Sequence, residues 1–269
     1  CSRRPRLQSL MELYWYQYAL IALVFTWSGF VRSGLGFGGA LFTIPFLLLI
    51  HDDPVFFLPI ISIHLLLFAP LTILLSKQKA ADAEGNPVTD IHRINWRFVR
   101  FALTIMFIPK LAGVIGLIVL PTDLMNSIIF LLIAGYSMTY ILGRPLQSSS
   151  QTLDIVFLII GAYISGTSLV GGPMVIAVAL RHIKPYEFRD TLFVIWTVLV
   201  SIKLAAFAWV GVSLNLVPAL YLLPFAAIGH FIGLGAHEKL LRQDSKKFYQ
   251  ILGSILLCAS GAGLYQVLN

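Results

Sequence analysis

The sequence contains few charged residues. Asp, Glu, Lys and Arg together make up 12% of its 269 residues, whereas hydrophobic residues make up 58%. An ordinary soluble domain carries roughly a quarter charged residues, so this composition predicts a polytopic membrane protein instead. The net charge of +7 would suggest a nucleic-acid partner in a soluble protein. Here the basic residues lie mostly in short loops between apolar runs, which is the positive-inside pattern. We therefore expect a lipid bilayer and no nucleic acid.

Cysteine is also scarce, with only Cys1 and Cys258 in the chain. Two distant cysteines exclude a disulfide framework and a zinc-type site. No His, Cys and Asp cluster has metal-ligand spacing, no nucleophile and base form a convincing arrangement, and no lysine follows the glycines in Walker spacing. We expect no metal, no cofactor and no enzymatic activity. Residues 1–13, which precede the first apolar run, are interpreted as an N-terminal extension.

Acidic residues are missing from the interior of the apolar runs. All twelve lie in loops or near the ends of those runs, whereas Arg32, Lys110 and Lys203 lie inside them. A buried cation at the middle of a membrane helix costs at least about 2.5–3.5 kcal/mol. Because no acid is placed to offset that cost, a bound anion is the natural partner. The sequence therefore predicts an anion site within the membrane.

Each of these internal polar residues also has a plainer explanation. Lys203 could extend toward the membrane surface if its span is tilted, and Lys110 follows a proline, so it could bond carbonyls freed by a kink. His64 and His230 could be satisfied core histidines, or they could carry protons. Arg32 stands directly beside a glycine-rich stretch, which favours a role in binding.

Two glycine-rich stretches, residues 33–39 and 165–173, lie at the centres of apolar segments 133 positions apart. Glycine permits backbone angles that a helix interior does not adopt. We interpret the stretches as breaks in two membrane-embedded helices. The alternative is that they are small-residue grooves for close helix packing.

The rest of the chain repeats around these two breaks. We predict an all-α protein with a first membrane repeat at 14–142, a linker at 143–152 and a second repeat at 153–269. Each repeat would hold one broken segment and three full spans, and such duplications are common in secondary transporters. The polar loop at 76–95 separates two spans of the first repeat.

The positive-inside rule favours an inverted arrangement of the two repeats. If each broken segment returns to the side it entered, thirteen Lys and Arg residues lie on one side and three on the other. If each segment crosses once, the counts are nine and seven. The first alternative obeys the rule and makes both segments re-entrant hairpins. The arms of the second segment, 153–165 and 173–183, also look too short to span.

Helices that restart after the breaks would complete the site. Restarts at Gly39-Ala40 and Gly172-Pro173 would direct free amides and positive dipole ends toward a bound anion, and proline suits such a first turn. Nearby serine and threonine hydroxyls add donors. The predicted substrate-binding residues are Arg32, Ser33, Gly34, Gly36, Gly38, Gly39, Lys110, Ser165, Gly166, Thr167, Ser168, Gly171, Gly172, Lys203 and His230; His64 and His230 are the possible proton relay.

At these residues the chain resembles the sulfite exporter TauE/SafE family, also described as sulfonate uptake permeases. The first motif is Gly34-x-Gly36-Phe37-Gly38-Gly39 followed by Pro45, and the second is Gly166-x-x-x-x-Gly171-Gly172-Pro173. The resemblance covers nearly the whole chain. It implies an integral membrane protein that moves small sulfur-containing or organic anions.

We therefore expect a multi-pass secondary transporter, most readily an exporter, in the cell (inner) membrane. Its substrate would be sulfite, another sulfur oxyanion or an organosulfonate, carried by alternating access around a midplane site. The alternatives are a passive anion channel and a permease for carboxylates or other organic anions. A non-transporting scaffold would leave the internal cations unexplained. The sequence leaves the anion, the direction of transport, the coupling ion and the oligomeric state open.

Overall fold

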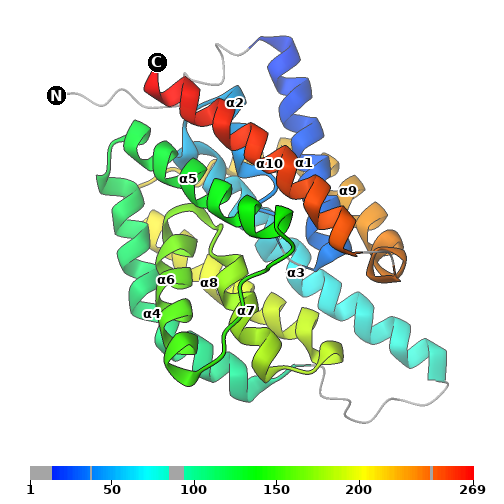
Figure 1. The fold of residues 1–269 in the computed structure, drawn as a ribbon. Coiled ribbons are helices and arrows are strands. Elements are labelled where there is room, and N and C mark those ends of the chain that lie inside the picture. Colours follow the sequence, from blue (N-terminus) through cyan, green and yellow to red (C-terminus); the bar gives the residue numbers. More distant parts are fainter. Residues whose placement is uncertain (1–13, 37, 85–93, 243–244) are drawn as a thin grey trace.

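A computed structural model describes residues 14–36, 38–84, 94–242 and 245–269, and within this part of the chain every regular element is helical. The all-α prediction is confirmed. The predicted extension at 1–13 lies outside the described residues. The ten helices (Figure 1) are α1 (Trp15–Leu35), α2 (Ile44–Ile50), α3 (Pro54–Glu84), α4 (Trp96–Val119), α5 (Thr122–Ile141), α6 (Gln151–Ser168), α7 (Gly172–His182), α8 (Pro185–Trp209), α9 (Leu216–Arg242) and α10 (Ser245–Leu268).

Eight of these helices, all except α2 and α7, are long and apolar enough to cross a membrane. Their outward faces carry large apolar side chains, and Trp209, Ile108 and Val119 are each at least 74% exposed. A soluble monomer rarely exposes so much apolar surface, whereas a lipid-facing helix requires it. The protein is a multi-pass membrane protein, as predicted.

Local sequence explains where several helices begin. Pro54 and Pro185 open α3 and α8, positions at which the missing proline N–H has no helical partner to lose. The Asn95 side chain accepts a hydrogen bond from the Phe98 amide at the start of α4, and Ser150 does the same for Leu153 at the start of α6. Such caps satisfy amides that a helix leaves unpaired at its first turn.

The two broken segments form the pairs α1–α2 and α6–α7, but two predicted details are wrong. The first segment restarts at Ile44 and not at Gly39-Ala40, because residues 39–43 form turns. The arm before the second break is α6, which has 18 residues and is long enough to span, because it begins at Gln151 and continues through Ser168. A third correction concerns the loop at 76–95, since α3 continues through Glu84.

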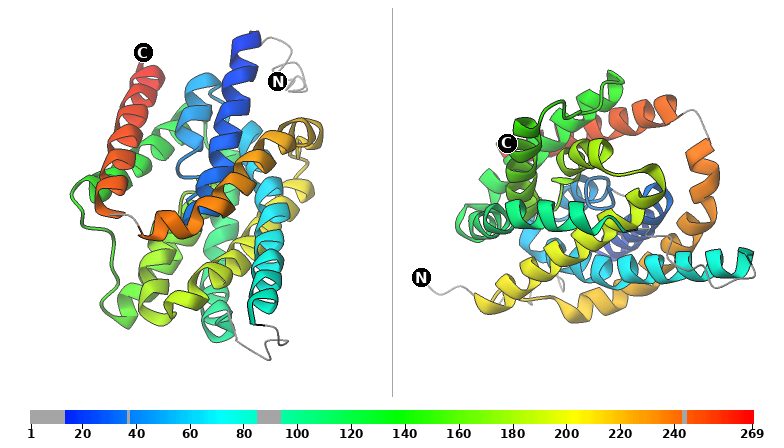
Figure 2. Two further views of the ribbon diagram at one scale, coloured as in Figure 1. Left: turned by 90° about the vertical axis from the view of Figure 1, so that its right-hand side faces the viewer. Right: turned by 90° about the horizontal axis from the view of Figure 1, so that it is seen from below.

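The helices pack in matched pairs. Helix α1 lies along α9 and α6 lies along α4, while α3 packs against α8 and α5 against α10. Figure 2 shows that α1 begins, and α10 ends, at one end of the bundle, whereas α6 and α8 begin at the other. Both breaks therefore lie within the bundle.

Glycine allows the α1–α9 and α4–α6 pairs to approach closely. A Cβ added to Gly229 of α9 would lie 1.8 Å from the Thr26 carbonyl oxygen, and one added to Gly113 of α4 would lie 2.2 Å from that of Tyr163. Gly166 of α6 faces Gly113 across the second contact. The small-residue packing that we weighed as an alternative is thus present, beside the breaks themselves.

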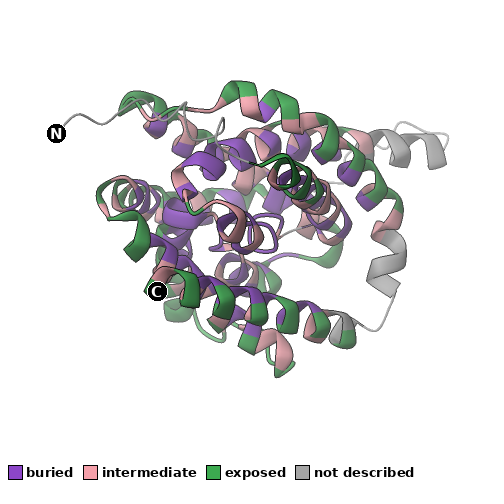
Figure 3. Ribbon diagram, turned by 90° about the horizontal axis from the view of Figure 1, so that it is seen from above, coloured by how far each residue is buried: buried purple, intermediate pink, exposed green. Residues whose placement is uncertain are grey.

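The buried apolar residues form two clusters. One cluster is built mainly from α1, α2, α3, α5 and α10, and the other from α4, α6, α7 and α8. Figure 3 shows the buried residues at the centre of the bundle and the exposed ones around its rim. Ala40, Leu41 and Phe42 of the first break and Val170 of the second all belong to the first cluster.

Candidate functional site

A small cavity of about 50 Å³ lies between the two breaks. Residues from both glycine stretches line it, although they are more than 120 positions apart in the sequence. A single water needs about 10–15 Å³ of such space, so the cavity has room for a few waters or one small oxyanion. Its lining is Arg32, Gly38, Gly39, Ala40, Leu41, Leu65, Ser165, Leu169, Val170, Gly172, Pro173, Phe193, Trp196, Leu199 and Val200.

Arg32 is the only charged residue among those that line the cavity. Its side chain is 4% exposed, and its Nε and Nη2 atoms have no hydrogen-bond partner in the described structure. The guanidinium carbon lies 4.8 Å from the centre of the Phe68 ring, so a cation–π contact supports one face of it. Burying this cation is costly unless its donors find an acceptor. The unpartnered donors make Arg32 a candidate partner for a bound anion.

The first break positions Arg32 through its backbone. Gly36 ends α1 in the left-handed conformation, with φ of 78°, and its amide donates to the Arg32 carbonyl. Gly39 then passes close to the Arg32 side chain, because a Cβ at position 39 would lie 3.0 Å from the Arg32 Cβ. The chain thus folds back over Arg32 and encloses it.

The two glycines of the second break have different surroundings. A Cβ added to Gly171 would lie 1.9 Å from the Gly161 carbonyl oxygen, so Gly171 is required for packing between α6 and the start of α7. A Cβ added to Gly172 would meet only the Trp196 ring, at 4.0 Å. Gly172 begins α7 with Pro173 next to it. Position 172 therefore faces the cavity, whereas position 171 faces a neighbouring backbone.

Lys110 and Lys203 converge on the C-terminal end of α6. Lys110 Nζ donates to the carbonyl and the hydroxyl of Ser165, at 2.8 and 2.9 Å. Lys203 Nζ donates to the carbonyls of Gly166 and Thr167, at 2.7 and 3.3 Å. Both side chains are fully buried, and no carboxylate of the described residues pairs with them. Lys203 bonds carbonyls of the kind that a helix end leaves unpaired, whereas the Ser165 carbonyl also accepts from the Leu169 amide, at 3.2 Å. Both lysines face the negative dipole end of α6.

This arrangement resembles the plainer explanation that we gave for Lys110, although the carbonyls belong to α6 and not to a kink in α4. Lys203 is not extended toward the membrane surface, since it is buried. Neither lysine lines the cavity. Their charges lie behind its wall.

The histidines surround Phe68. The His230 ring lies 4.6 Å from that of Phe68, and its Nδ1 is hydrogen-bonded to the Ser33 hydroxyl. The His64 ring lies 6.4 Å away, and its Nε2 bonds the Ala219 carbonyl at 2.8 Å. The Phe68 ring thus contacts His230 on one side and the Arg32 guanidinium on another. A proton relay through His64 or His230 stays a prediction.

The other predicted hydroxyls are engaged with the backbone. Thr167 and Ser168 both donate to the Ile164 carbonyl, at 2.9 and 3.0 Å. Of the four predicted serines and threonines, only Ser165 lines the cavity. Gly34 likewise lies behind it, with its carbonyl bonded by His237 Nδ1 at 2.6 Å. Of the predicted set, the structure brings together Arg32, Gly38, Gly39, Ser165 and Gly172 at the cavity.

Sequence reasoning missed the apolar wall. Leu65 of α3 and Phe193, Trp196, Leu199 and Val200 of α8 line the cavity. Nothing in their spacing distinguishes them from other apolar residues of the same spans. Trp196 offers the one signal, because tryptophan in membrane helices usually lies at the interface and this one lies near the middle of α8.

A larger, mostly apolar pocket of about 430 Å³ adjoins this site. It lies among the ends of α5, α7 and α10 that face the basic loops, and its polar lining includes Tyr140 and Tyr249. Pro173 lines both this pocket and the cavity.

Eight helices that are long and apolar enough to cross a membrane, together with a cavity whose one charged lining residue is Arg32, are what a polytopic membrane transporter for an anion would require. The chain belongs to the sulfite exporter TauE/SafE family, whose sequence profile matches residues 20–264. This is a family of membrane transporters for sulfite and other sulfur anions. No curated protein and no solved structure matches the chain.

Proposed function

We propose that the protein is a secondary transporter, working as an exporter, for sulfite, another sulfur oxyanion or an organosulfonate. The observation that carries the proposal is the buried Arg32 guanidinium, whose Nε and Nη2 atoms lack partners beside a cavity lined by both breaks. A planar guanidinium suits an oxyanion, because it donates two parallel hydrogen bonds. A cavity of about 50 Å³ suits a small one.

The paired packing of the helices supports two inverted repeats with re-entrant hairpins. Helix α1 packs on α9 as α6 packs on α4. Lys110 of α4 contacts Ser165 near the second break, and His230 of α9 contacts Ser33 near the first. Inverted repeats place a substrate site at their interface near the midplane. Alternating access would then move the two repeats around Arg32.

Placement in the cell (inner) membrane would let the membrane potential drive export. With the basic loops inside, an inside-negative potential contributes about 2.3 kcal/mol per charge per 100 mV to the exit of an anion. No proton relay is required for this direction.

The test is flux of sulfite, sulfonates and carboxylates in liposomes that contain the wild type or Arg32→Ala. We expect sulfur anions to be transported and Arg32→Ala to reduce the rate about tenfold or more, since a charge-assisted hydrogen bond is lost. Arg100→Ala is the matched control, because Arg100 is an exposed arginine on α4 away from the cavity.

Three outcomes would contradict the proposal. Normal flux by Arg32→Ala would show that Arg32 is not part of the binding site. Transport of carboxylates without transport of any sulfur anion would assign a different substrate class. Absence of trans-acceleration in an exchange assay would indicate a passive channel.

A further inference from the structure

A third pocket, of about 520 Å³, lies at the basic end of the bundle, away from the cavity between the breaks. It is lined by Asn95, Arg97, Phe98, Phe101, Gln151, Asp154, Arg181 and His182. These residues come from the start of α4, the start of α6 and the end of α7. Because α6 runs from this pocket to the cavity over 18 residues at 1.5 Å per residue, the two sites are separate.

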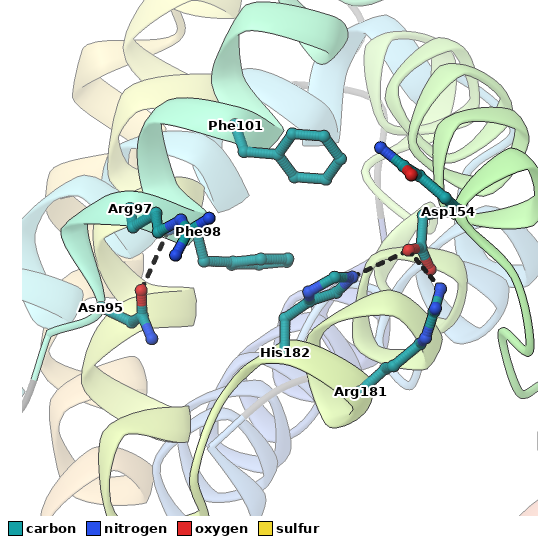
Figure 4. A pocket seen from close by; sticks show the side chains of 8 residues that line it. Asn95, Arg97, Phe98, Phe101, Asp154, Arg181 and His182 are labelled. Atoms are coloured by element: carbon teal, nitrogen blue, oxygen red, sulfur yellow. Dashed lines mark hydrogen bonds and ion pairs between the residues drawn. The ribbon is translucent and has the colours of Figure 1, made fainter.

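Some of the charged side chains that line this pocket are paired with one another, and one is not. The Asp154 carboxylate is fully buried and accepts from Ser148 at 2.5 Å, from Arg181 Nη1 at 2.6 Å and from His182 Nε2 at 2.8 Å. Arg181 therefore neutralises Asp154. The Arg97 side chain is exposed and forms no hydrogen bond or ion pair with any described residue, so no carboxylate of the described residues balances its positive charge. Figure 4 shows Asp154, Arg181 and His182 meeting on one side and the Phe98 and Phe101 rings on the other.

The residues beside the pocket are of the kind found at a membrane interface. Trp96, the first residue of α4, is 53% exposed next to Arg97, and tryptophan is enriched at the headgroup level. Tyr186 is exposed at the same end, and Lys184 lies 5.8 Å from its ring. Basic pockets between membrane helices on the side of the positive loops are suited to phosphate-bearing headgroups.

We propose that this pocket binds a phosphate-type anion, with Arg97 as its charge partner and the Gln151 amide as a further donor. A volume of about 520 Å³ is typical of a ligand site and is too large for the anion alone. The Phe98 and Phe101 rings would contact the apolar part of the ligand. The shared chemistry is a phosphate group, carried either by an anionic phospholipid or by a soluble phosphate.

The experiment measures binding to the detergent-solubilised full chain by native mass spectrometry, so it is independent of transport. One arm uses phosphatidylglycerol and the other inorganic phosphate. Binding of the lipid without competition by phosphate would identify a headgroup as the source, whereas binding of phosphate alone would identify a soluble ligand. Binding of either probe supports the proposed site if that binding depends on Arg97.

Arg97→Gln is expected to weaken binding about tenfold, because one charge-assisted hydrogen bond is lost. Arg100→Gln is the matched control, since it removes the same charge from an exposed position three residues along α4 that does not line the pocket. Arg97→Lys should retain part of the affinity. Equal weakening by Arg97→Gln and Arg100→Gln, or no binding of either probe, would overturn the proposal.

Discussion

The two breaks end their helices in different ways. Helix α6 ends with two lysines from other helices on its last carbonyls. Helix α1 carries a cation in its own last turn, and the Nε and Nη2 atoms of that cation, Arg32, bond no carbonyl. Three buried cations therefore divide into two that stabilise a helix end and one that faces the cavity. Burial of a positive charge in a membrane helix does not by itself identify a substrate site.

The backbone of the two breaks differs as well. Gly36 and Leu169 occupy corresponding positions, and both adopt left-handed angles, with φ of 78° and 61°. A leucine in that region costs about 1–2 kcal/mol. The second break holds this conformation without glycine, next to an α6 end that the lysines already stabilise. Packing around the second break therefore compensates for a local strain that the first break avoids.

The largest expected effect separates the two glycines of the second break. Gly171→Ala would place a methyl group 1.9 Å from the Gly161 carbonyl oxygen, and backbone cannot give way cheaply, so we expect a loss of about 3 kcal/mol or more of stability. Gly172→Ala should fold normally but reduce anion flux, because its methyl group enters the cavity. Thermal unfolding in detergent and liposome flux measure the two effects. Equal melting temperatures for the two variants would refute this division of roles.

An intermediate effect distinguishes the lysines from Arg32. Lys203→Met leaves the Gly166 and Thr167 carbonyls without this donor, which should cost about 1–3 kcal/mol. Arg32→Met removes no hydrogen bond from Nε or Nη2, so its melting temperature should stay close to that of the wild type while its flux is lost. The opposite pattern, a stable Lys203→Met without transport, would place Lys203 in the binding site.

The smallest effect concerns the end of α1. Gly36→Ala keeps a left-handed angle with a Cβ present and sets that atom 3.1 Å from Arg189 Cγ, so we expect a loss of about 1–2 kcal/mol. Because the Arg189 side chain is flexible and can move away, most of this loss of stability should come from the left-handed backbone angle and little from the contact. Chemical denaturation measures the change. An unaltered stability would mean that the first break tolerates a side chain as the second does at Leu169.

Composition and spacing predicted the membrane class and the two broken segments, since these depend on local hydropathy and on the positions of the glycines. They also singled out Arg32, because it adjoins the break in the sequence. The contacts of Lys110 and Lys203 could not be predicted, since they depend on which helices pack against α6. The start of α2 was missed because the turn at 39–43 contains apolar residues, such as Leu41 and Phe42, that look helical.

Pro173 has a further consequence for access to the site. It lines both the central cavity and the pocket of about 430 Å³ at the basic end, so it forms part of the wall between them. A proline ring has no long side chain that could swing aside, and its backbone φ is fixed. Opening the wall at Pro173 therefore requires the start of α7 to shift as a unit. The gate on that side would be a helix end and not a side chain.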